Sequence, residues 1–375
     1  MDLKTRMTEL ARTEPSSTPV VSVYLNTHWR DEHQRDRVRV FLKNALAEAR
    51  AARVAGLSEA DLHWVESEGG ALLNQTSMTE ARGVALFACE AAGLREILPS
   101  RASFENLFRV AEAPVLRPLA ELVELAPPAL VVFVDAESAR LMLVSPDGAV
   151  EEEVLRADVP GHHRRGGWAQ MAQSRYQRHI QDHRARHFAA VAEAVVGLVD
   201  EHEVRRIVLA GDPPNVPVFR EQLPRRIADL VVGTVTGAHH EATAVMVGRA
   251  AEYVSHAQAQ QEAAAVDAAL TTAAKRGRAT AGLDATLEAV NRGAVHRLYL
   301  LKGWSTPGRR CTGCGRLQAG FTWVCPTCGR EATTVDLAEA MTARVIAAGG
   351  SMGTIESHQP LAAAGGVAAE LRFPV

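Results

Sequence analysis

Two C-x-x-C motifs stand ten residues apart near the C-terminal end of the chain, with their thiols at Cys311, Cys314, Cys325 and Cys328. This spacing lets four thiolates reach one tetrahedral ion, and each motif supplies two ligands from one tight turn. Gly313, Gly315, Pro326 and Gly329 are the residues that such turns require. Because four sulfurs close the coordination sphere, we expect a structural zinc ion in a ribbon over residues 309–331, without a catalytic role.

Reducible disulfides and an iron–sulfur cluster are the alternatives for these cysteines. A cytosolic setting disfavours disulfides, and the paired spacing is more typical of a zinc ribbon than of a cluster. The fifth cysteine, Cys89, lies in the apolar stretch 83–89. We expect it to be a buried core thiol.

Length and charge limit the number of domains and the partners that the chain can have. The 375 residues, 47% of them hydrophobic, suffice for two or three cores, and we expect three. The first ten residues have no apolar segment of a secretory signal, and no apolar run approaches a membrane span, so a cytoplasmic protein without a membrane partner is predicted. A net charge near −3 offers no general field for nucleic acid, so RNA binding requires a local basic patch, and no DNA partner is expected.

Hydrophobic periodicity predicts an α/β fold in three domains. The expected domains are 1–125, 126–275 and 276–375. The first has strands at 20–25 and 83–89, a helix at 31–53, and a second helix whose capping box is formed by Ser58 and Asp61. The second has strands at 129–134 and 206–212, a hairpin turn at 145–148 between two apolar strands, and helices at 168–199 and 242–274. The third has helices at 283–291 and 337–347, a strand at 297–303 and the cysteine ribbon.

The segment 160–188 is the most polarised part of the chain. It holds six arginines and five histidines against one acid, Asp182. Gly166 and Gly167 leave the backbone free for close approach to a crowded ligand. Basic residues repeat three and four apart in the following helix, from Arg175 to His187, and aromatic residues lie among them, which suits phosphate neutralisation with base stacking. A plain solvated helix after a flexible loop is the simpler interpretation.

From this segment onward, the chain resembles the archaeal and eukaryotic class-I peptide-release factors, which carry a Gly-Gly-Gln loop in a pattern like R-G-G-Q-S-x-x-R-F. Arg165, Gly166 and Gly167 match the loop, and 175–195 resembles the helix that follows it. Residues 282–304 and 365–373 resemble the family's last domain, whose fold is shared with kink-turn-binding ribosomal proteins and often holds a zinc ribbon. The resemblance covers residues 125–375 and lies mainly in the order of the motifs.

The chain also departs from the family pattern. Trp168 stands where the family has glutamine, and Gln170 and Gln173 follow. This arrangement resembles the bacterial branch and the Vms/Ankzf-type peptidyl-tRNA hydrolases, whose loop has a Gly-x-x-Gln form. The first 125 residues carry neither the NIKS nor the Tyr-x-Cys-x-x-x-Phe motif of stop-codon reading, so codon-directed termination is not expected.

The resemblance implies a ribosome-associated enzyme that hydrolyses peptidyl-tRNA and rescues stalled ribosomes without a stop codon. It assigns loop insertion and water positioning to Gly166, Gly167 and Gln170, with Gln173 as the substitute. The predicted RNA-binding residues are Arg164, Arg165, Trp168, Arg175, Arg178, Arg184 and Arg186. Expected partners are the large-subunit rRNA and the P-site tRNA, and a delivering GTPase is a further candidate.

Two other functions stay open. The missing glutamine at position 168 favours a non-catalytic factor that resembles Balon-type hibernation proteins and occupies the A site. An RNA-binding adaptor unconnected to the catalytic centre is the third. Neither the histidines, whose spacing is irregular, nor the turn 211–215, which lacks the glycine spacing and lysine of nucleotide loops, indicates a further site.

Overall fold

A computed structural model describes residues 3–13, 18–29, 31–74, 81–100, 103–125, 128–145, 150–156 and 169–375. The chain divides into two compact units. One combines both ends of the chain, Met1–Leu125 and Glu262–Val375, and the other is Ala126–Gln261. Among the described residues, no helix is long and apolar enough to cross a membrane.

The N-terminal part of the first unit is built on an antiparallel sheet of four strands in the order β3-β2-β1-β4. Its elements are α1 (Leu3–Ala11), β1 (Val20–Asn26), α2 (Glu32–Ala52), α3 (Glu59–Asn74), β2 (Gly83–Cys89), η1 (Glu90–Ala92), β3 (Leu94–Ser100), β4 (Leu107–Ala111) and α4 (Arg117–Leu125). The central strand β1 is buried on both faces. Val21 and Val23 pack beneath α2 and α3, whereas Tyr24 points into the opposite core.

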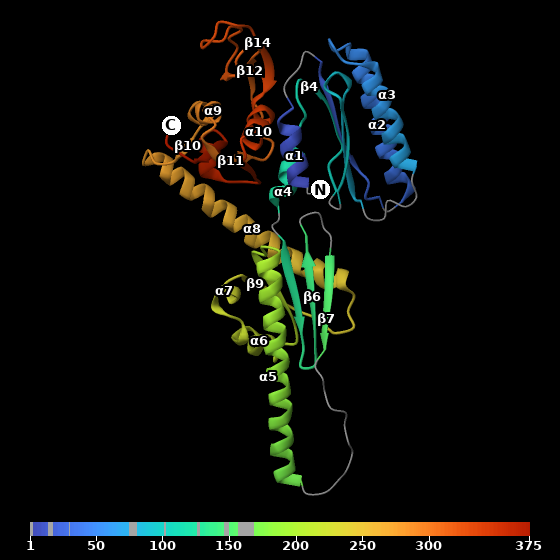
Figure 1. Ribbon diagram of the computed structural model, residues 1–375, viewed down its shortest axis with the longest axis vertical. Helices are drawn as coiled ribbons and strands as arrows, with labels where there is room; N and C mark the ends of the chain where they lie inside the picture. The colour runs from blue at the N-terminus through green and yellow to red at the C-terminus, as the bar shows by residue number, and fades with distance from the viewer. Residues whose placement is uncertain are drawn as a thin grey trace. The chain divides into compact units, whose positions relative to one another are not determined.

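Local signals explain the limits of α2. The side chain of Asp31 accepts a hydrogen bond from the Gln34 N–H at 2.8 Å, which satisfies one of the free donors at the helix start. At the other end, Arg53 adopts a left-handed conformation with φ 46°. The short connection to α3 follows from there, so the two helices lie against each other over one face of the sheet (Figure 1).

The C-terminal part of the first unit contains two further sheets, ordered β10-β16-β11-β15 and β13-β12-β14. Its elements are β10 (Ala279–Ala281), α9 (Leu283–Asn291), β11 (Val295–Leu301), β12 (Pro307–Cys311), β13 (Leu317–Ala319), β14 (Ala332–Asp336), α10 (Leu337–Ala347), β15 (Ser351–Ile355), α11 (Gln359–Ala363) and β16 (Val367–Leu371). One core cluster joins this part to the N-terminal part, because Leu10 and Leu119 belong to the same cluster as Leu337 and Met341.

The second unit is a five-stranded sheet in the order β7-β6-β5-β8-β9, with β5, β8 and β9 parallel. Its elements are β5 (Ala129–Val134), β6 (Ser138–Val144), β7 (Val150–Arg156), α5 (Ala169–Glu201), β8 (Arg206–Gly211), α6 (Val216–Gln222), α7 (Arg225–Ala228), β9 (Val231–Thr236) and α8 (Thr243–Ala274), of which α8 continues into the first unit. Helices α5 and α6 pack on one face, and the start of α8 packs on the other. The first half of α5 extends beyond the sheet (Figure 1).

The α/β class predicted from periodicity is confirmed, and the predicted strands and helices lie within a few residues of the observed ones. Two local predictions were wrong. The strand after the hairpin turn is not apolar, because β7 carries Glu151, Glu152 and Glu153 and is exposed along nearly its whole length. The capping box also does not form: the Ser58 hydroxyl donates to Glu90, and buried Asp61 accepts from the Glu90 N–H at 2.9 Å.

Candidate functional site

The two cysteine motifs form near-identical turns. In the first, the Gly315 N–H donates to the Cys311 carbonyl at 3.0 Å, and in the second, the Gly329 N–H donates to the Cys325 carbonyl at 2.9 Å. Both glycines have positive φ angles, 69° and 73°, which L-residues with a side chain rarely adopt. A second backbone hydrogen bond closes each turn, from the Cys311 N–H to the Arg316 carbonyl at 3.0 Å and from the Cys325 N–H to the Arg330 carbonyl at 2.8 Å.

The four thiols converge on one point. The Cys311 and Cys328 Sγ atoms are 3.3 Å apart, the Cys314 and Cys325 Sγ atoms are 3.6 Å apart, and all four lie within 4.8 Å of one another. Sulfur ligands about 2.3 Å from a tetrahedral ion are separated by about 3.8 Å. The cluster can therefore hold a metal ion, and all five cysteines are free of disulfides. The thiol of Cys89 is fully buried, as predicted.

Backbone amides prepare the first motif for the thiolate form that metal binding requires. The N–H groups of Gly313 and Cys314 point at the Cys311 sulfur, at 3.3 Å and 3.4 Å. The Cys314 N–H contributes most to lowering the pKa of Cys311, which falls to about 6. The Thr327 N–H makes the equivalent contact to Cys325 at 3.4 Å. Such donors stabilise negative charge on the sulfur and leave the ribbon ready for a cation.

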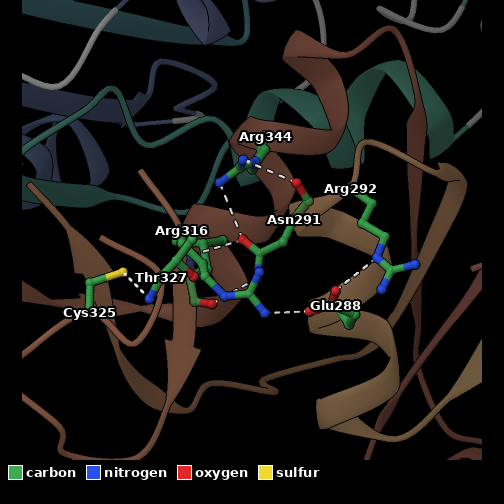
Figure 2. A network of polar contacts seen from close by, with 8 residues as sticks. Glu288, Asn291, Arg292, Arg316, Cys325, Thr327 and Arg344 are labelled. Carbon is green, nitrogen blue, oxygen red and sulfur yellow. Dashed lines mark hydrogen bonds and ion pairs between the residues drawn. The ribbon is translucent and has the colours of Figure 1, made fainter. Parts of the chain in front are cut away.

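A polar network fastens the first motif to helices α9 and α10 (Figure 2). Asn291 holds Leu317 by two 2.8 Å hydrogen bonds, one from its amide to the Leu317 carbonyl and one from the Leu317 N–H to its oxygen. Arg344 donates to the Gly315 carbonyl at 2.7 Å, and Arg316 pairs with Glu288. These anchoring residues carry no motif, so sequence reasoning missed them.

An exposed aromatic residue also belongs to the ribbon. Trp323 is 63% exposed, and the guanidinium of Arg309 lies 3.5 Å from the centroid of its ring. The cation fixes one face of the indole by a cation–π contact. No motif marks Trp323 in the sequence, although its position two residues before Cys325 places it within the ribbon.

The predicted reaction loop lies outside the described residues. This applies to Arg164, Arg165, Gly166, Gly167 and Trp168. The backbone of Gln170, Gln173, Arg175 and Arg178 belongs to the first turns of α5, but their side chains also lie outside the described part. The roles of all these residues stay predictions.

Further along α5, the described residues modify the expected basic surface. Arg186 is exposed, whereas Arg184 is half-buried with its guanidinium 5.9 Å from the Phe188 ring centroid. His187 is buried beside Phe188, so it belongs to the core and not to the basic surface. Arg186 is thus the predicted RNA contact that is most accessible in the described part of the helix.

A serine, a histidine and an aspartate meet at the end of β5, but in an order unsuited to nucleophilic catalysis. The Ser138 hydroxyl lies 3.0 Å from an Asp135 carboxylate oxygen and 2.9 Å from His239 Nδ1. The serine therefore stands between acid and imidazole, whereas a catalytic triad places the imidazole between them. Asp135 also accepts from the N–H groups of Glu137 and Ser138, which shapes the hairpin turn. We interpret this group as structural.

The turn at 211–215 leads from β8 into α6, and its purely structural role stays a prediction. The Asp212 carbonyl accepts from the Asn215 N–H at 2.9 Å, and the short helix α6 follows directly. Among the described residues, the four cysteines are the one group of histidine, cysteine or acidic side chains arranged for a metal ion.

The middle of the chain matches a known protein family. Residues 114–262 match the family model described as bacterial archaeo-eukaryotic release factor family 10. The match confirms the resemblance to the bacterial branch of the release-factor superfamily that the sequence motifs predicted. No curated protein matches the sequence.

Several solved structures are also similar to the chain. An archaeal translation termination factor, aRF1, has 17% identity over 99% of this chain and 97% of that chain, with a TM-score of 0.27. Pelota from Archaeoglobus fulgidus has 15% identity over 78% of this chain and 79% of that chain, with a TM-score of 0.36. An archaeal Pelota in a ribosome-bound model with ABCE1 has 14% identity over 99% and 94%, with a TM-score of 0.43.

Proposed function

We propose that this chain is a ribosome-binding translation factor that hydrolyses peptidyl-tRNA at the peptidyl-transferase centre without reading a stop codon. The observation that carries the proposal is the sequence position of Gly166 and Gly167, separated from the start of α5 by one residue and within the segment that matches the release-factor family model. A glycine pair that precedes a long helix in the sequence suits insertion of the backbone into a crowded RNA site.

The start of α5 supports the chemistry. The first four N–H groups of a helix have no partner within the helix, and the helix dipole adds partial positive charge at the same end. Water attacks the ester carbonyl carbon that joins the peptide to the tRNA ribose. Nearby hydrogen-bond donors stabilise the resulting oxyanion. The ester C–O bond then breaks, and the ribose oxygen takes a proton that the water releases. The products are a free peptide carboxylate and a tRNA hydroxyl.

Gln170 is the residue that we assign to water positioning. It is the second residue of α5, and Gln173 follows it by three positions. Residues three apart lie on neighbouring parts of a helix surface, so Gln173 can substitute where Gln170 is absent. A neutral amide that accepts one hydrogen bond and donates another can orient water without acting as an acid or a base.

The arginines of the loop and helix supply the contacts with RNA. We assign phosphate contacts to Arg164, Arg165, Arg175, Arg178 and the exposed Arg186, and base stacking to Trp168. The half-buried Arg184 has a smaller role. The partners are the large-subunit rRNA and the P-site tRNA in the cytoplasm, and a GTPase that delivers the chain is a further proposed partner.

The test uses ribosomes that carry a labelled peptidyl-tRNA in the P site and have an empty A site. Peptide release is measured beside a pelleting assay for binding, with wild type, Gln170→Ala, Gln173→Ala and the double variant. We expect binding by all four proteins and release that is lost in Gln170→Ala or in the double variant.

The second candidate function is a hibernation factor that occupies the A site without chemistry. Trp168 favours it, because the family motif has its reactive glutamine at that position. This function predicts tight binding to idle ribosomes and no peptide release by the wild type.

We also propose that the four-cysteine cluster holds zinc. The sulfurs alone fill a tetrahedral sphere, so the ion would stabilise the ribbon and offer no open position to substrate. Cys311, Cys314, Cys325 and Cys328 would be its ligands.

A further inference from the structure

A cavity of about 330 Å³ opens beside the end of β1 in the first unit. The volume lies at the lower end of the range that small ligands occupy. Its lining comes from the end of β1, the start of α2 and the segment before β4. The polar and aromatic lining residues are Asn26, His28, Trp29, Gln34, Arg37 and Asn106.

Two asparagines present hydrogen-bond donors at this cavity. The Asn106 side-chain oxygen accepts from the Asn26 N–H at 2.8 Å, and the Asn26 side-chain oxygen accepts from the His28 N–H at 2.9 Å. Because backbone N–H groups already engage both oxygens, each amide has its NH₂ group left to offer. The pair therefore suits a ligand that is rich in hydrogen-bond acceptors.

One arginine at the cavity can contact an anion. At the start of α2, Glu32 pairs with Arg35 at 3.3 Å, and Asp36 pairs with Arg39. Asp31 is engaged as the helix cap. Arg37 is exposed, and within the described part of the chain no acidic side chain forms an ion pair with it. Its guanidinium therefore has no acidic partner among the described residues and can contact an anion at the cavity.

The indole ring of Trp29 gives the cavity a flat aromatic surface. The residue is half-buried and packs against the core beneath α2, which restrains its ring. The Arg35 guanidinium lies 5.9 Å from the centroid of the ring. An indole restrained in this way loses little freedom when a planar group stacks on it, and nucleic-acid bases are the common planar partners of such rings.

We propose that this cavity binds a nucleoside phosphate, with the base against Trp29, its acceptor atoms at the amides of Asn26 and Asn106, and the phosphate at Arg37. The ligand is either one nucleotide of a single-stranded RNA or a free nucleotide. The inference goes beyond the proposed function and is independent of it, since the glycine loop belongs to the other unit.

Fluorine NMR of the full chain labelled with 5-fluorotryptophan tests the proposal at the site itself. The chain has five tryptophans, and a Trp29→Phe variant identifies the Trp29 signal. The probes are AMP, a single-stranded oligoribonucleotide of mixed sequence, and inorganic phosphate. Because Trp29 reports locally, RNA that binds only the basic helix α5 leaves its signal unchanged.

A shift with the oligoribonucleotide alone supports an RNA strand as the source of the ligand, and a shift with AMP alone supports a free nucleotide. A shift with both supports a nucleotide site open to either. An equal response to inorganic phosphate overturns the assignment of a base, and no response to any probe overturns the proposal.

Two variants that remove proposed ligand contacts and one control variant complete the test. Arg37→Ala removes the cation, and Asn106→Asp removes an amide donor while it keeps the oxygen that accepts from the Asn26 N–H. Each should weaken the binding of the probe that shifts the Trp29 signal by roughly tenfold or more, the effect of losing one ionic contact or one strong hydrogen bond. Lys43→Ala removes an exposed cation from the same helix outside the cavity and should change nothing. Equal affinities in all three variants contradict the proposal.

Discussion

Arg344 Nη1 donates a 2.7 Å hydrogen bond to the carbonyl oxygen of Gly315, so helix α10 holds the residue that closes the first cysteine turn. Arg344 also contacts the side-chain and backbone oxygens of Asn291 at 3.4 Å. One side chain thereby connects the ribbon to two helices of the same unit. The ribbon is an integral part of this unit and not a loose appendage.

Removing this side chain should destabilise the first unit. We expect Arg344→Ala to lower the free energy of unfolding by about 1–3 kcal/mol, because the Gly315 carbonyl loses a charged, partly buried donor. Urea denaturation measures the change. Arg292→Ala is the matched control, since it removes an exposed arginine that pairs with Glu288 and should cost at most about 1 kcal/mol. Equal losses in both variants would contradict the anchoring role.

The cysteine cluster predicts one bound zinc ion per chain. Elemental analysis of the purified protein should find it, and Cys314→Ser or Cys328→Ser should lose it together with thermal stability, because metal binding and folding of the ribbon are coupled. Cys89→Ala is the control, since this buried thiol lies outside the cluster and its loss should leave the zinc content unchanged. Full zinc content in the Cys314→Ser and Cys328→Ser variants would refute the assignment.

Glu339 predicts a pH dependence of stability. Burial raises its pKa from 4.5 to about 7, and one of its carboxylate oxygens has no hydrogen-bond partner among the described residues. Because the folded state holds the proton more tightly than the unfolded state, its contribution is fully present below pH 4.5 and is lost as pH rises through about 7. Glu339→Gln should therefore stabilise the protein by roughly 1–3 kcal/mol at pH 8 and have little effect at pH 4.5.

Denaturation curves at both pH values measure this difference. Glu288→Gln serves as the control, because hydrogen bonds from Arg292 and Arg316 lower the pKa of Glu288, so its replacement should not stabilise the protein at pH 8. A pH-independent effect of Glu339→Gln would show that burial does not govern this carboxyl.

Arg186 is the described residue that best tests the RNA-binding surface of α5. Arg186→Ala should weaken ribosome binding and reduce the slope of log affinity against log salt by roughly one, as expected for one lost phosphate contact. Arg220→Ala, an exposed arginine on α6, is the control and should leave both unchanged. Binding across a salt series gives the slope, and identical slopes for the two variants would count against this surface.

The local features of the fold followed well from the sequence. Apolar runs and helix periods predicted β1, α2, β2 and β5, because these elements bury one or both faces and therefore show a strong pattern. The cysteine spacing predicted the cluster, since ligand geometry depends on short turns. The exposed character of β7 was harder to predict from the sequence, because an exposed edge strand needs no apolar alternation.

Long-range contacts could not be derived from local pattern. Asp61 is satisfied by Glu90 and Arg95, so a tertiary partner replaced the predicted capping box. The shared core of both chain ends places Leu119 and Met341 in one cluster, which no periodicity encodes. The cavity beside Trp29 combines segments about 80 residues apart, so its residues carry no recognisable spacing.

Peptide release from ribosomes with an empty A site tests the central proposal most directly. Wild type and Gln170→Ala are compared at equal ribosome occupancy, which the pelleting assay establishes, and Gln173→Ala is measured alongside. We predict peptide release by the wild type and loss of release, with binding intact, when Gln170 or both glutamines are replaced. Tight binding by the wild type without any release, or undiminished release by the double variant, would contradict it.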